Sequence, residues 1–168
     1  MTSSGYKGQP NTWQDKLAVS DFLRQGGSVY MLLDRQIEES LQTLFDYAKQ
    51  SAAAGDQAGA AKLFKLLTFY DAWSFDYWFH LGKCCQAQRV WIDAIYAYGR
   101  AAQIKVASPE APCAAGECYL AGGNKTYARK AFHAALLICG ELKQNQAVRQ
   151  RSRAGLAAMG DGDESISD

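Results

Sequence analysis

Reactive side chains are densest in the stretch DYWFHLGKCCQA, residues 76–87, which holds His80, Lys83 and the adjacent cysteines Cys84 and Cys85. Such a set could bind a metal or supply a thiol nucleophile beside a histidine base. Structural zinc needs four converging ligands, however, and adjacent residues on a helix point about 100° apart. Buried thiols packing as small apolar groups explain the cysteine pair better, so we expect neither a metal nor a cofactor.

The rest of the chain adds little that could do catalysis. The five cysteines are odd in number and show no paired C-x-x-C spacing, which favours a reducing compartment. His133 has no carboxylate or cysteine near it in the sequence, and no phosphate-binding glycine loop, metalloprotease helix or paired-carboxylate motif occurs. We therefore predict that the protein is not an enzyme.

Charge and composition argue against nucleic-acid-binding and membrane-binding proteins. The chain has 168 residues, 48% of them hydrophobic, with a net charge of +1, so no global field draws it to nucleic acid or to anionic lipid. The basic cluster RQRSR, residues 149–153, is expected to be a solvated helix face. The polar N-terminal residues lack the apolar run of a secretory signal, and we expect a soluble intracellular protein with neither membrane nor nucleic acid as partner.

The elements that position these residues are predicted to be helices in a repeat. Three prolines and no sustained alternating pattern indicate an all-α chain. Shifting the sequence by 34 residues superimposes matching small and aromatic residues: Ala60 on Ala94 and Ala128, Phe64 on Tyr98 and Phe132, and Gly82 on Gly116. The order Trp78-x2-Leu81-Gly82-x2-Cys85, followed by Ala94 and Tyr98, matches the tetratricopeptide (TPR) pattern.

This period predicts a superhelix of three helix pairs with flanking helices. The predicted segments are a disordered N-terminal segment (1–15), an N-terminal helical arm (16–40), three TPR repeats (41–74, 75–108 and 109–142), a C-terminal capping helix (143–159) and a disordered acidic tail (160–168). Within the middle repeat, we expect Gly82 to face Ala94 at the close contact between the paired helices, and we expect Ser108 and Pro109 to cap and start the third repeat.

The first helix of each repeat is expected to line an inner, concave groove. Counting along the repeat pattern gives the groove positions Phe45, Lys49, Ala52, Asp76, Phe79, Lys83, Gln86, Glu110, Cys113, Glu117 and Leu120. A clamp for a C-terminal carboxylate would need several Lys, Arg and Asn side chains, but Phe45, Phe79 and Cys113 stand among these positions. The groove therefore suits an extended peptide that inserts apolar side chains.

Two segments carry a resemblance to a known family. The run LFKLLTFYDAWSFDYWFHLGKCCQAQRVWIDAIYAYGRAAQIK (63–105) and APCAAGECYLAGG (111–123) resemble the class II (translocator) chaperones of type III secretion, the LcrH/SycD/IpgC family. GGSVYMLLD (26–34) resembles in particular the branch that includes SscA. The likeness covers roughly residues 17–158.

The resemblance implies a bacterial cytoplasmic chaperone without catalytic activity. Its partners would be hydrophobic translocators of the SseC/SseD kind, held through an extended PxLxxP-type segment in the groove. The family also implies a homodimer formed by N-terminal helices, for which Phe22, Leu23 and Leu32 are the candidates. Some relatives also bind a transcription regulator, so a regulatory adaptor that binds a folded partner through its convex face or through Arg149–Arg153 is the alternative interpretation.

Overall fold

The computed structural model describes residues 20–21, 24–26 and 35–160. Within these residues the chain forms seven α-helices and one 3-10 helix, with no strand, which confirms the predicted all-α TPR fold. The elements are α2 Arg35–Ala53, α3 Gln57–Tyr70, α4 Phe75–Ala87, α5 Trp91–Ile104, α6 Glu110–Ala121, α7 Lys125–Cys139, η2 Lys143–Asn145 and α8 Gln146–Ala157.

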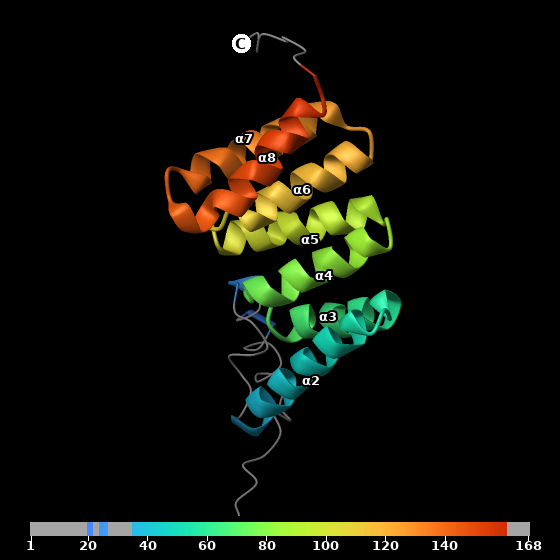
Figure 1. Cartoon of the computed structure of the whole chain (residues 1–168). Helices are drawn as coiled ribbons and strands as arrows, with labels where there is room; N and C mark the ends of the chain where they lie inside the picture. The colour runs from blue at the N-terminus through green and yellow to red at the C-terminus, as the bar shows by residue number, and fades with distance from the viewer. Residues whose placement is uncertain (1–19, 22–23, 27–34, 161–168) are drawn as a thin grey trace, which may run out of the picture.

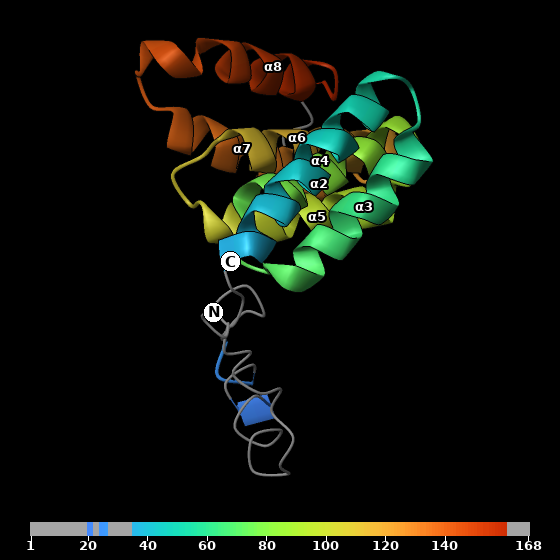
Figure 2. The same ribbon diagram turned by 90° about the horizontal axis from the view of Figure 1, so that it is seen from below.

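The helices form one stack in which each packs against the next in the sequence. Figure 1 shows the stack rising from α2 and α3 through α4, α5 and α6 to α7 and α8. Seen from below (Figure 2), α8 runs along one edge of the stack while α2 and α3 lie in front of α4 and α5, so the helices are offset from one another as in a superhelix. The helix α2 begins at Arg35, so it continues through the boundary predicted between residues 40 and 41.

Capped turns join the two helices of a pair. Gly55 and Gly123 have φ of +98° and +83°, a left-handed conformation that glycine adopts without a steric penalty. The next residues cap the following helices: an Asp56 carboxylate oxygen accepts from the Gly59 amide at 2.8 Å, and the Asn124 side chain accepts from the Tyr127 amide at 3.1 Å. The prediction that Ser108 caps α6 is wrong. Its hydroxyl donates to the Glu110 carboxylate, and no side chain caps α6.

The close contact inside each pair differs from the predicted one. A Cβ added to Gly82 would lie 2.7 Å from the Tyr98 ring, and one added to Gly116 would lie 2.8 Å from the Phe132 ring. Both rings are fully buried. The nearest group to Gly82 is therefore the Tyr98 ring of the partner helix, where Ala94 was expected.

The buried side chains form two clusters along the stack. The larger cluster runs from α2 to α6 and includes Phe64, Leu67 and Tyr98. The smaller one joins α6, α7 and α8 through residues such as Phe132, Cys139 and Val148. The dimer candidates Phe22, Leu23 and Leu32, the segment 1–15, most of the arm 16–40 and residues 161–168 of the tail lie outside the described residues.

Candidate functional site: an inner surface of α2, α4, α6 and α8

The α2 and α4 end of the predicted groove is aromatic. The Phe45 ring lies 5.3 Å from the Tyr77 ring and 5.2 Å from the His80 ring, centroid to centroid. The half-buried Phe79 ring stacks on Phe75 at 5.3 Å and lies 5.5 Å from the Tyr98 ring. Phe45 and Tyr98 are themselves buried in the larger cluster, so the partly exposed rings of Tyr77 and Phe79 supply the open apolar area for a peptide anchor.

Three predicted groove residues line one cavity between α2, α3 and α4. Lys49, Ala52 and Lys83 lie at this cavity, whose volume is about 390 Å³. The remaining lining residues are Ala53, Gln57, Phe64, His80, Cys84 and Ala87. The walls are therefore mainly apolar, while Gln57, two lysines and a histidine supply the polar groups. Lys49 also pairs with Asp46 at 3.3 Å, with both side chains about half exposed, so this pair is weak.

Polar side chains replace the aromatic ones toward α6 and α8. The Tyr98 hydroxyl donates to the Gln86 side-chain oxygen at 2.7 Å, and the Gln86 amide donates to a Glu117 carboxylate oxygen at 3.3 Å. The other Glu117 oxygen lies 2.7 Å from Arg151 Nη2 and accepts from Arg151 Nε at 2.9 Å. This chain of hydrogen bonds joins α5, α4, α6 and α8.

Most of the other predicted positions are less open. Cys113 is 0% exposed and lies under α8, with its thiol 3.9 Å from the Val148 carbonyl oxygen, so it does not face the groove. Leu120 is partly buried against the smaller cluster. Glu110 is half-buried and accepts from Ser108, whereas Asp76 is exposed. The structure thus brings Phe45, Lys49, Ala52, Phe79 and Lys83 together at one end, with Gln86 and Glu117 beside Arg151.

The titratable groups of residues 76–87 do not have the pKa values that catalysis needs. Burial raises the pKa of the Cys84 thiol to about 11 and also raises the pKa of Cys85, so both stay protonated thiols near neutral pH. Burial lowers the pKa of His80, whose Nδ1 lies 2.8 Å from the Asp76 carbonyl oxygen. Because a carbonyl only accepts, Nδ1 carries the proton, and the imidazole is neutral at pH 7.

Two of the three arginines of α8 make contacts with the stack. Arg149 donates to the carbonyl oxygens of Gly140 and Leu142, where it satisfies the C-terminal end of α7. Arg151 reaches the predicted groove residue Glu117, and the sequence reasoning missed this role. One signal could have found it: Arg151 follows Glu117 by 34 residues, which is one repeat period.

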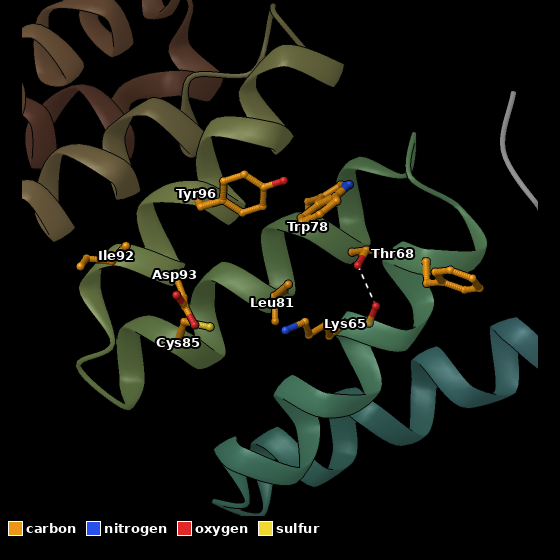
Figure 3. Close-up of a pocket in the computed structure, with 9 residues that line it drawn as sticks. Lys65, Thr68, Trp78, Leu81, Cys85, Ile92, Asp93 and Tyr96 are labelled. Atoms are coloured by element: carbon orange, nitrogen blue, oxygen red, sulfur yellow. Dashed lines mark hydrogen bonds between the residues drawn. The ribbon is translucent and has the colours of Figure 1, made fainter. Parts of the chain in front are cut away.

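A second, larger cavity lies between α3, α4 and α5, away from the predicted groove. Its volume is about 580 Å³, and Figure 3 shows Trp78 and Tyr96 at one side with Leu81 and Cys85 between the helices. Among its lining residues, Phe69 and Ile92 are 70% and 82% exposed. This apolar cavity is the structural feature that favours the adaptor alternative.

Neither a metal centre nor a membrane span is found in the described part of the chain. Among those residues no group of three or more His, Cys, Asp or Glu side chains could hold a metal ion. None of the helices described there has the length and apolar content that a membrane span requires.

Comparison with known proteins places this geometry among secretion proteins. No protein-family model and no curated protein matches the chain. Among solved structures, a type III secretion complex from Aeromonas hydrophila is 27% identical with a TM-score of 0.77, over 84% of this chain and 94% of that one. The translocator chaperone SycD of Yersinia enterocolitica is 26% identical with a TM-score of 0.71, over 79% of this chain and 98% of that one.

Several similar structures contain a bound segment. PcrH in complex with the chaperone-binding region of PopD is 27% identical with a TM-score of 0.69, over 72% of this chain and 91% of that one. PcrH has also been solved with the chaperone-binding region of PopB, and SycD with a peptide of the translocator YopD. The similar proteins are thus chaperones, a class without catalytic activity.

Proposed function

We propose that this chain is a translocator chaperone of type III secretion, like the similar structures, and that it binds an extended segment of a hydrophobic translocator along the inner surface of α2, α4 and α6. Binding would keep the translocator soluble in the bacterial cytoplasm until secretion. The segment would be of the PxLxxP kind, in translocators of the SseC/SseD type. Placement within the SscA branch stays a prediction from sequence resemblance.

One observation carries the proposal: α4 presents partly exposed aromatic rings beside an apolar cavity. Tyr77 and Phe79 supply the rings, with Phe45 buried beneath Tyr77, and Ala52 with Phe64 supplies cavity wall. An extended peptide gains affinity mainly from a few apolar side chains that enter such places. SycD and PcrH, which share the fold, are solved with segments of YopD, PopD and PopB.

A substitution in α4 tests the groove. Phe79→Ala should weaken binding of a synthetic PxLxxP peptide by about 2 kcal/mol, the cost expected for an anchor residue, as measured by isothermal titration calorimetry. Because Phe79 contacts buried Tyr98, circular dichroism must show that the variant stays folded, and Phe79→Leu should retain most of the affinity. Unchanged affinity in a folded Phe79→Ala variant would rule out this groove.

The adaptor alternative rests on the cavity between α3, α4 and α5. Ile92, on α5, is 82% exposed at this cavity, so Ile92→Asp serves as the matched control for Phe79→Ala. The groove proposal expects Ile92→Asp to bind the peptide as the wild type does. If Ile92→Asp instead abolished capture of a transcription regulator or another folded partner while Phe79→Ala had no effect, the adaptor function would be favoured.

A homodimer also belongs to the proposal. SycD is solved in an alternative dimer, which is a property of that protein. The candidates in this chain, Phe22, Leu23 and Leu32, stay predictions because they lie outside the described residues.

A further inference from the structure

The repeat period continues into α8 and aligns four charged residues along the inner surface. Lys49, Lys83, Glu117 and Arg151 follow one another at intervals of 34 residues, on α2, α4, α6 and α8. A Cβ added to Gly155 of α8 would meet the Phe132 ring, the same ring that a Cβ on Gly116 would meet. α8 therefore packs against the same ring of α7 as α6 does, and we name these four residues the charge row.

The two ends of the charge row differ in electrostatic state. At the α6 and α8 end, Glu117 and Arg151 neutralise each other at 2.7 Å, and Gln86 donates to the same carboxylate. At the α2 and α4 end, Lys49 and Lys83 both line the cavity of about 390 Å³, so two charges of the same sign meet there. The inner surface thus has a positive end and a neutral end.

Acidic groups near the positive end compensate it only in part. Asp46 pairs with Lys49 at 3.3 Å, but it is on the neighbouring turn of α2 and does not line the cavity. Asp76 is exposed at the start of α4, and no ion pair joins a carboxylate of the described residues to Lys83 within 4.0 Å. His80 also lines the cavity, and because burial lowers its pKa the imidazole is neutral at pH 7 and does not change the charge there.

We propose that Lys49 and Lys83 are specificity-determining residues that recognise an acidic side chain of the client segment, placed directly beside the apolar side chain that enters the cavity between α2 and α4. Apolar walls receive the anchor, while the lysine ammonium groups at the same cavity pair with the carboxylate. The acidic residue therefore belongs at the α2 and α4 end of the groove, because Glu117 and Arg151 satisfy each other at the other end. The inference rests on the proposed function, since it concerns the same groove and client.

Three synthetic peptides test the inference directly. They share a PxLxxP core and differ only at the two positions that flank the leucine, which carry glutamate, glutamine or lysine. With the wild-type chain we expect the glutamate peptide to bind about tenfold more tightly than the glutamine peptide, as for a charge-assisted hydrogen bond, and the lysine peptide to bind most weakly. Raising the salt concentration to about 0.5 M should reduce these differences.

Two variants assign the effect to the cavity. The Lys49→Gln/Lys83→Gln double variant should bind the glutamate and glutamine peptides equally. Lys62→Gln removes an exposed lysine of α3 that lies outside this cavity, and it should keep the full difference. If Lys62→Gln lowered the affinity difference between the glutamate and glutamine peptides as much as the double variant does, net charge alone would explain that difference and the inference would be overturned.

The outcomes separate this inference from the proposed function. Equal binding of all three peptides to the wild type would overturn the role of Lys49 and Lys83 and leave the groove function standing. Failure of every peptide to bind would remove the groove function, and the inference with it.

Discussion

At the scale of single residues, glycines set how closely the paired helices approach. The repeat pattern identified Gly82 and Gly116 as positions that must be small, and both are buried in the structure. It did not identify what they contact, because a sequence period gives the position of a side chain along a helix but not the rotamer of the residue opposite. The rings of Tyr98 and Phe132 occupy those places.

Gly82→Ala and Gly99→Ala should change stability in opposite directions. The added methyl at position 82 would lie 2.7 Å from the buried Tyr98 ring, whereas a Cβ at position 99 meets nothing within 4 Å. Overpacking should cost Gly82→Ala about 1–3 kcal/mol. Gly99→Ala should raise the free energy of unfolding by about 0.5–1 kcal/mol, because alanine is the better helix former at an exposed position. Urea unfolding monitored by circular dichroism measures both values, and a stabilised Gly82→Ala variant would disprove the packing role of the glycine.

At the scale of elements, α8 does more than end the stack. The sequence indicated a capping helix with solvated arginines, because RQRSR is polar and has no apolar stripe of its own. In the structure, Val148 of α8 is buried over Cys113 and Phe132, while Arg151 reaches across to Glu117. The predicted groove position Cys113 is covered for this reason. Burial of Val148 and the Glu117–Arg151 ion pair hold α8 in this place; the period aligns Glu117 with Arg151 but does not show that their side chains meet.

Val148→Ala should loosen α8 locally. Loss of two buried methyl groups should lower the free energy of opening by about 1.5 kcal/mol, which corresponds to about tenfold faster labelling of the thiols beneath α8. Those thiols are Cys113 and Cys139, both 0% exposed and part of the smaller cluster. N-ethylmaleimide labelling followed by peptide mass spectrometry measures each cysteine separately.

The remaining cysteines provide the internal control for that experiment. Cys84, Cys85 and Cys118 belong to the larger cluster, so their labelling rates should stay at the wild-type values. Equal acceleration of all five cysteines would mean that Val148→Ala lowers global stability and that α8 does not open by itself.

At the scale of the whole molecule, the 34-residue period was enough to predict the all-α stack. It pairs Phe45 with Phe79, and Lys49 with Lys83, at equivalent positions of the first helices, but it did not predict that Phe45 is buried in the larger cluster. The period could not predict the cavity between α3, α4 and α5, which depends on how Trp78 and Tyr96 pack edge to face at 5.8 Å. It also could not predict the division of the core into two clusters, since that depends on which side chains touch between successive pairs.

That division predicts how a local defect spreads through the stack. In repeat proteins each unit contacts mainly its neighbours, so the loss of one contact destabilises the nearest helices most. Leu67 is fully buried in the larger cluster, so its replacement should mainly destabilise α2, α3 and α4. Leu67→Ala should cost about 2–5 kcal/mol locally and speed amide hydrogen exchange in those helices by more than about tenfold.

Amides of α7 and α8 should change much less in Leu67→Ala, because the smaller cluster that holds these helices contains no residue of α3. Val148→Ala should give the reverse pattern, with faster exchange in α7 and α8 and little change in α2 and α3. Hydrogen exchange measured by mass spectrometry resolves the two ends of the chain. If both variants accelerated exchange uniformly from α2 to α8, the molecule would unfold as one cooperative unit, and the inner surface could not open at one end while staying folded at the other.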